Sequence, residues 1–177
     1  MNRHITNKET AMSDIETIYL AGGCFWGLQK FFDQFDGVVL TEAGYANGSD
    51  RAPSYKEVCA GSGHAETVKV VYDKNQINLE KLLDYYFMVI DPVSVNQQGN
   101  DRGVQYRTGI FYSNETQLSV IQAVFKREES KAGQKLAVVV ESLNNFFSAE
   151  EYHQKYLDKN PDGYCHIPER YFEIEKL

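Results

Sequence analysis

A cysteine that follows two glycines is the first side chain in the sequence that could act as a nucleophile. Cys24 comes after Ala21-Gly22-Gly23 and is followed by Phe25-Trp26. Cysteine attacks as the thiolate, and a helix N-terminus favours that anion through its unpaired N–H groups and its dipole. A buried cysteine that only packs at a strand–helix junction is the alternative. The aromatic neighbours favour the nucleophile, since they would form the wall of an apolar pocket, but packing stays open.

A histidine and a glutamate form the second candidate group, in Gly63-His64-Ala65-Glu66. An H-x-E pattern is part of the zinc deaminase signature, which also requires a downstream P-C-x-x-C. The sequence has no such element, and Cys59 and Cys165 each stand alone, so we expect no zinc site. We expect His64 to be a structural histidine with a hydrogen bond. Taken by itself, Glu66 could be only a solvated carboxylate at the start of a strand.

A long polar loop is the third candidate. Residues 92–105 contain Asp101 and many other hydrogen-bonding groups, and the chain continues through Tyr106 into an apolar strand. Loops of this length inside a domain are usually functional. A plain surface loop would have a similar composition, so the loop alone decides nothing.

The elements that carry these residues follow from the spacing of the apolar side chains. Leu28, Phe31, Phe32 and Phe35 recur at i, i+3, i+4 and i+7, which predicts a helix that begins beside Cys24. Short β-rich runs predict strands at 15–20, 38–41, 67–72, 108–112 and 136–140. Capping residues predict further helices from Asn78, Asn114 and Ser148.

Up to residue 112 the order of these elements is β-α-β-β-α-β, the split β-α-β arrangement. We therefore expect an α+β fold with a ferredoxin-like split β-α-β core, additional C-terminal helices and an irregular tail. No repeat or linker indicates a second domain. We predict a flexible N-terminal lead-in at residues 1–14 and a single catalytic domain at residues 15–177.

Composition narrows the class of protein further. The chain has 177 residues, 42 % of them hydrophobic, and a net charge of −7, which argues against a nucleic-acid partner. No apolar run has the length of a membrane span, and residues 1–14 lack the apolar core of a secretory signal. An odd number of cysteines, three, does not form a disulfide framework. We expect a cytoplasmic, monomeric protein.

Six stretches in order resemble the peptide methionine sulfoxide reductases of the A type. They are Gly23-Cys24-Phe25-Trp26-Gly27, Ala43-Gly44-Tyr45 with residues 53–59, Gly63-His64-Ala65-Glu66, residues 98–107, residues 150–154 and residues 160–165. The resemblance covers nearly the whole chain, from about residue 18 to residue 165. Asn47 departs from the family's usual glycine, and the loop between Cys59 and Gly63 is one residue short.

The resemblance implies a role for each of eight residues and implies no cofactor. Cys24 would attack the sulfoxide sulfur and become a sulfenic acid, and Glu66 would be the acid, with a pKa raised by an apolar pocket. Cys165 would be the resolving cysteine, and thioredoxin the reductant of the resulting disulfide. Substrate, the S epimer of methionine sulfoxide in oxidised proteins or free, would be bound by Phe25, Trp26, Tyr55, Asp101 and Tyr106. We assign Cys59 to packing.

Three other classes of protein share part of this pattern. A cysteine hydrolase would pair Cys24 with His64 or His153 as its base and would not need Cys165. A peroxidase would form the same sulfenic acid but prefer hydrogen peroxide. A binding module would expose the aromatic residues as a patch and leave no cysteine reactive.

Overall fold

The computed structural model describes residues 14–176. The expected lead-in at residues 1–14 thus lies outside the described residues except for Asp14. The elements, in chain order, are β1 (Ile15–Ala21), α2 (Phe25–Asp33), β2 (Val38–Ala46), α3 (Tyr55–Cys59), β3 (Ala65–Asp73), α4 (Leu79–Val89), β4 (Gln97–Gln98), β5 (Asp101–Arg102), η1 (Val104–Tyr106), β6 (Gly109–Tyr112), α5 (Glu115–Ala132), β7 (Val139–Ser142), β8 (Phe146–Ser148), η2 (Glu151–His153), α6 (Tyr156–Lys159) and η3 (Glu169–Lys176).

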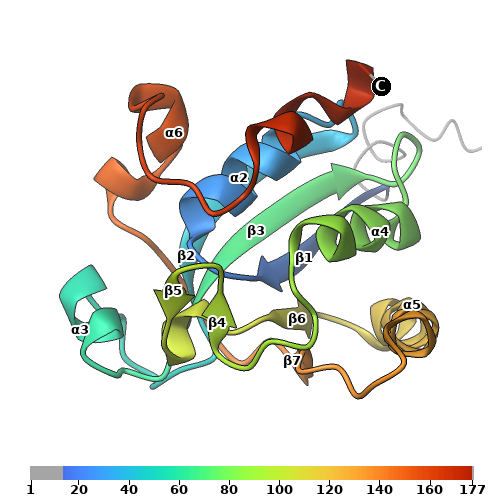
Figure 1. Cartoon of the computed structure of the whole chain (residues 1–177), viewed down its shortest axis with the longest axis horizontal. Coiled ribbons are helices and arrows are strands. Elements are labelled where there is room, and N and C mark those ends of the chain that lie inside the picture. Colours follow the sequence, from blue (N-terminus) through green and yellow to red (C-terminus); the bar gives the residue numbers. More distant parts are fainter. Residues whose placement is uncertain (1–13, 177) are drawn as a thin grey trace, which may run out of the picture.

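A mixed sheet with the strand order β7-β6-β1-β3-β2-β8 forms the centre of the molecule. Its four middle strands, β6-β1-β3-β2, are antiparallel neighbours, and α2 and α4 connect them as a split β-α-β core does. The expected fold is confirmed. Figure 1 shows α2 running alongside β3 and the C-terminal segment, in red, lying over α2. β7 extends the sheet parallel to β6, and β8 extends it at β2.

The core lies between the sheet and these helices. Val68, Val70 and Tyr72 share one face of β3, as the sequence predicts, and all three are fully buried. The same core cluster contains Leu28, Phe31 and Phe32 from the apolar face of α2, and Phe35 just beyond the end of that helix. Burying such side chains is the main source of stability for a domain of this size. No helix within residues 14–176 combines the length and the hydropathy needed to cross a bilayer.

Helix boundaries agree with the capping residues at two places. Asn78 Oδ1 accepts a hydrogen bond from Lys81 N (2.8 Å), and Asn114 Oδ1 accepts one from Gln117 N (2.9 Å). α4 then ends just before Asp91-Pro92, as expected. Strands are longer or shifted: β2 reaches Ala46, β3 begins at Ala65, and β7 occupies 139–142 instead of 136–140.

The expected continuous helix after Ser148 is wrong. The chain forms η2 and α6 with a break at Lys155, whose φ is +53°. Long-range hydrogen bonds cause the break: Lys155 N donates to Gln29 Oε1 (3.0 Å), and the Gln154 amide bonds to both the N and the O of Ala43 (2.9 and 2.8 Å). These partners lie more than a hundred residues away, so local sequence cannot reveal them.

The contacts of Gln154 predict a stability effect. In Gln154→Leu, Ala43 N and Ala149 O lose their hydrogen bonds to the side-chain amide, and Ala43 O keeps only the one from Ala149 N. We expect the free energy of unfolding to fall by about 1–3 kcal/mol. Urea unfolding of the variant and the parent measures this difference in the free energy of unfolding. Gln134→Leu is the control, because Gln134 is exposed, and it should change stability by less than about 0.5 kcal/mol. Equal effects of the two changes would contradict this account of the break.

Candidate active site

Cys24 lies where the chain leaves the sheet and enters α2. It is the N-cap residue of α2, with an extended backbone (φ −61°, ψ 129°). Before it, Gly23 has a φ of +75°, and a Cβ there would lie 2.8 Å from His166 Nε2 and 2.9 Å from Gln98 Cβ. Only glycine fits this turn, because the left-handed backbone and the close neighbours both exclude a side chain. The turn holds Cys24 at the helix N-terminus.

The thiol of Cys24 is buried, with 7 % of the residue exposed. Burial raises the pKa of the thiol well above its ordinary value, and the negative charges of Glu66 and Asp101 raise it further, while a backbone hydrogen bond from Trp26 lowers it. The helix N-terminus therefore does not make Cys24 a thiolate in the resting protein. The thiol has to lose its proton during the reaction.

Glu66 comes from β3 and faces the start of α2. Its residue is 1 % exposed, and its Oε1 accepts a hydrogen bond from Phe25 N (3.2 Å). Burial raises the pKa of Glu66 to about 8, against the lowering effect of the Phe25 hydrogen bond; the charge of Asp101 raises it, and the interaction with Cys24 lowers it. Oε2 has no hydrogen-bond partner among the described residues. Glu66 is thus a mostly protonated acid at neutral pH with one oxygen open.

Two tyrosines adjoin this acid. Tyr55 is the first residue of α3, and Tyr106 is the last residue of η1, in the long loop. Burial first raises the pKa of both phenols; the charge of Glu66 acts on each of them, and the pKa of Tyr55 is raised further by a hydrogen bond with Cys59. Both phenols stay protonated at neutral pH and can donate hydrogen bonds. Tyr106 is also tied to the turn, since Gly23 N donates to its carbonyl O (3.1 Å).

The indole of Trp26 is held by two residues to which the sequence gave no substrate role. Trp26 Nε1 donates to His153 Nδ1 (3.0 Å), and its ring stacks on Tyr156 with centroids 3.7 Å apart. The His153 ring also packs against the rings of Phe25 and Tyr55, with centroid distances of 5.2 and 4.6 Å. Both holding residues come from the segment after Ser148, and only their pairing with distant Trp26 reveals their part in the site.

The two histidines that a cysteine hydrolase would use are engaged elsewhere. His153 Nδ1 binds Trp26, and His64 Nδ1 binds Ser62 Oγ (2.8 Å) beneath Gly48. Burial lowers the pKa of both imidazoles. His64 is the structural histidine that the sequence predicts, and no hydrogen bond in residues 14–176 joins either ring to Cys24.

Asp101 connects the nucleophile to the C-terminal segment. Its Oδ2 accepts a hydrogen bond from Cys24 N (3.4 Å) and lies 3.7 Å from His166 Nδ1. Burial, with the charge and hydrogen bond of Asp101, raises the pKa of Tyr164 to about 12. Asp101 therefore lies beside residues on both sides of Cys165.

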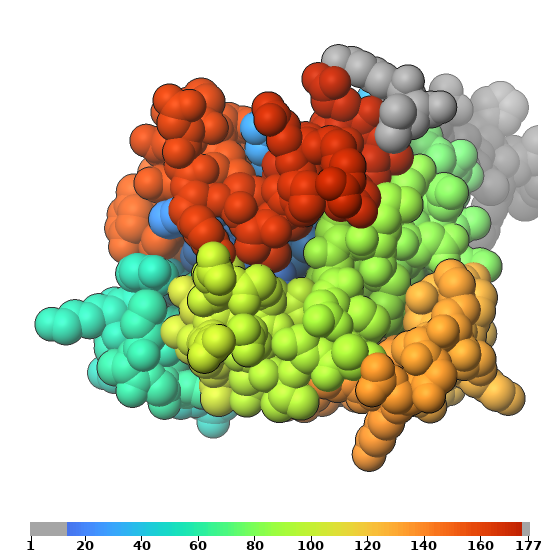
Figure 2. All heavy atoms as spheres, in the orientation of Figure 1, coloured from blue at the N-terminus to red at the C-terminus, as the bar shows by residue number. Residues whose placement is uncertain are grey.

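Cys165 lies against α2 one turn after Cys24. A Cβ on Gly27 would be only 2.7 Å from Cys165 Sγ, so the thiol occupies the space that glycine leaves free. Positions three apart on a helix lie on one face, about 5–6 Å apart at Cβ. Figure 2 shows the C-terminal segment covering α2, of which only small blue areas remain visible. The structure thus brings Cys24 and Cys165 to the same face, both as free thiols.

Cys59, in contrast, is exposed at the end of α3. Its assignment to packing is therefore wrong. The short helix buries Val58 and turns the next residue to solvent.

The departure at Asn47 is explained by its backbone. Asn47 has a φ of +53°, a conformation that glycine adopts freely and asparagine tolerates. Its Oδ1 accepts hydrogen bonds from Asn144 N (2.7 Å) and Asn145 N (3.3 Å). Asn47 thus keeps the turn and ties it to the segment before β8.

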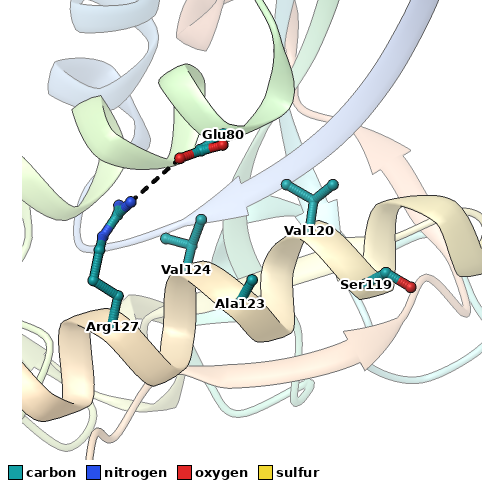
Figure 3. Close-up of a pocket in the computed structure, with 6 residues that line it drawn as sticks. All are labelled: Glu80, Ser119, Val120, Ala123, Val124 and Arg127. Atoms are coloured by element: carbon teal, nitrogen blue, oxygen red, sulfur yellow. Dashed lines mark hydrogen bonds and ion pairs between the residues drawn. The ribbon is translucent and has the colours of Figure 1, made fainter.

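A surface groove between α4 and α5 does not belong to this site. Figure 3 shows its lining, in which Arg127 reaches across to Glu80 (3.4 Å) beside Val120, Ala123 and Val124. Neither a cysteine nor a histidine lines it. The chemistry lies at Cys24.

The comparisons with known proteins agree with this geometry. The family model "Peptide methionine sulfoxide reductase" matches residues 16–176. The peptide methionine sulfoxide reductase MsrA of Lachnoclostridium phytofermentans is 52 % identical over 162 residues, which are 91 % of this chain and 98 % of that protein.

Two solved structures of Saccharomyces cerevisiae Mxr1 have the same fold. The reduced form is 41 % identical with a TM-score of 0.82, covering 86 % of this chain and 90 % of that one. Mxr1 in complex with Trx2 is 27 % identical with a TM-score of 0.59, covering 81 % and 86 %. On the match of its sequence and its fold, the chain belongs to the peptide methionine sulfoxide reductase family, as an A-type member.

Proposed function

We propose that this chain reduces methionine S-sulfoxide, in oxidised proteins and free, to methionine, with Cys24 as the nucleophile, Glu66 as the acid and Cys165 as the resolving cysteine. The observation that carries the proposal is the position of the Glu66 carboxyl. Buried beside the Cys24 thiol, it is mostly protonated at neutral pH, and its Oε2 has no hydrogen-bond partner within residues 14–176. A general acid needs such a pKa near the working pH and an open path to its proton acceptor.

The substrate would be oriented by the side chains around these two groups. Phe25 and Trp26 would contact the methyl group on sulfur, since an aromatic wall suits an apolar thioether derivative. Tyr55 and Tyr106 would donate hydrogen bonds to the sulfoxide oxygen. Asp101 would orient the polar backbone of the substrate. Because the methyl group has one fixed wall and the oxygen one fixed acid, only one epimer at sulfur would fit, and the resemblance to the family implies that it is the S epimer.

In the first step the Cys24 sulfur would bond to the sulfoxide sulfur while Oε2 of Glu66 gives its proton to the oxygen. The proton of the thiol passes to the carboxylate, so that Glu66 ends protonated again. The hydroxyl then passes from the substrate sulfur to the Cys24 sulfur as the substrate S–O bond and the new S–S bond break, so that methionine leaves and Cys24 becomes a sulfenic acid. The sulfoxide sulfur gains the two electrons that Cys24 loses, and no cofactor takes part.

In the second step the Cys165 thiol would condense with the sulfenic acid to a disulfide and water. A dithiol reductant then restores both thiols by exchange. The complex of Mxr1 with Trx2 supports a thioredoxin in this role. The whole cycle would run in one catalytic domain, residues 15–177, of a monomeric, cytoplasmic repair enzyme for oxidised methionine.

The proposal predicts a specific loss in Glu66→Gln. The amide keeps the shape and the Phe25 hydrogen bond but cannot supply a proton, so methionine formation in a single turnover should fall by about 10²–10⁴-fold. In the parent the rate should decline as the pH rises through about 8, where Glu66 loses its proton. Rapid-quench assays with methionine S-sulfoxide measure both.

Glu115→Gln is the control for that loss, because Glu115 is exposed in the first turn of α5. It should leave the rate and its pH dependence unchanged. If Glu66→Gln keeps a near-parental rate at neutral pH, another group is the acid.

The three cysteines should behave differently when each is replaced by serine. Cys24→Ser should form no methionine. Cys165→Ser should form one methionine per enzyme and then stop with thioredoxin, because the disulfide that thioredoxin reduces cannot form, while dithiothreitol could restore turnover. Cys59→Ser should turn over normally, since Cys59 is exposed. Methionine yield and free-thiol counts decide among them; a stall in Cys59→Ser, with Cys165→Ser cycling normally, would assign the resolving role to Cys59.

A further inference from the structure

We propose that Lys30 promotes the second chemical step, in which the Cys165 thiol attacks the Cys24 sulfenic acid, by stabilising the Cys165 thiolate. The inference rests on the resolving role proposed above for Cys165. Lys30 acts through Cys165 and takes no part in the first step.

The Cys165 side chain is held between Gly27 of α2 and Ile167 of its own C-terminal segment. Its sulfur lies in the space over Gly27, and Ile167, which is buried, fills the rest of that space at 3.4 Å from the Gly27 Cβ position. Cys165 Sγ lies 3.4 Å from both backbone polar atoms of Ile167: Ile167 N donates to the sulfur, and the thiol donates to Ile167 O while it is protonated. An N–H donor aimed at sulfur favours the anion. The thiol is therefore held at a fixed place on α2 with one stabilising dipole.

Lys30 stands on the same face of α2, one turn after Gly27. Its Nζ lies 4.9 Å from the ring centroid of Phe172, which belongs to η3. This cation–π contact holds the ammonium on the side of α2 that the C-terminal segment covers (Figure 2). The positive charge is thus anchored by the same segment that carries Cys165.

The charges around Cys165 act in opposite directions. Burial raises the pKa of the thiol, the Ile167 hydrogen bond and Lys30 lower it, and Asp101 of β5 raises it. Three titratable groups near Cys165 are neutral at neutral pH: the pKa of Tyr164 is raised to about 12, that of His166 is lowered by burial, and that of Cys24 is raised. Lys30 is therefore the positive charge that offsets the cost of a buried thiolate here.

The step needs no co-reactant. Cys165 loses its proton and its sulfur bonds to the Cys24 sulfur, while the S–O bond of the sulfenic acid breaks. The hydroxyl takes up one proton and leaves as water. This uptake balances the one proton that Cys165 released. The Cys24 sulfur is reduced and the Cys165 sulfur oxidised, each by one electron. Because the thiolate is the attacking form, its population sets the rate.

The experiment compares Lys30→Met with the parent in a single turnover. Methionine keeps most of the aliphatic stem and removes the charge. We expect methionine formation at the parental rate but disulfide formation slowed about 3- to 10-fold at pH 7, with its pH profile displaced to higher pH by about half to one unit. Acid quench and mass analysis of the Cys24–Cys165 disulfide follow the second step directly.

Two further variants separate charge from packing. Lys30→Arg keeps the charge and should restore the parental rate and pH profile. Lys81→Met is the matched control, because Lys81 makes the same kind of contact over Tyr85 at the same 4.9 Å on α4, and it should change neither step. A disulfide step in Lys30→Met that equals the parent's from pH 6 to pH 9 would overturn the inference alone. A parent that forms methionine but no Cys24–Cys165 disulfide would overturn the proposed resolving role as well.

Discussion

The burial of one carboxyl group against the start of α2 is the constraint on which the rest of the structure depends. Glu66 is nearly inaccessible, and its charge is opposed by burial and by the neighbouring Asp101. The single hydrogen bond from Phe25 N satisfies one oxygen without ionising the group. A carboxyl kept neutral in this way stores a proton next to Cys24. The same burial keeps the Cys24 thiol protonated at neutral pH.

The sheet sets the distance between these two groups. In the β1–β3 pairing Ala21 lies opposite Thr67, so the last residue of β1 and the start of β3 meet beside Glu66. Tyr86, from α4, fixes that edge by donating from its hydroxyl to Ala21 O (2.6 Å) and accepting from Gly109 N (3.1 Å). Two glycines then carry the chain from the sheet into α2. The C-terminal segment covers α2 and places Cys165 against that helix, beside Gly27. The fold thus brings Cys24, Glu66 and Cys165 together from three distant parts of the chain.

Much of this arrangement could be predicted from the sequence, because local signals carry it. The periodicity of Leu28, Phe31 and Phe32 predicted α2, and the caps at Asn78 and Asn114 predicted α4 and α5. The order of the elements predicted the split β-α-β core. β8, the break at Lys155 and the support of Trp26 by His153 could not be predicted, since each depends on a partner more than a hundred residues away. The protonation of Cys24 was also beyond the sequence: the helix N-terminus was visible there, but the burial that outweighs it was not.

The central claim is that Glu66 carries a proton at neutral pH before any substrate is bound. The most direct measurement is a titration of the Glu66 side-chain carboxyl by ¹³C NMR in the reduced, substrate-free protein, with the resonance assigned by its loss in Glu66→Gln. The account predicts a midpoint at about 8. A midpoint near the ordinary value of 4.5 would contradict it, because the carboxyl would then be ionised at neutral pH and could not donate the proton that the sulfoxide oxygen requires.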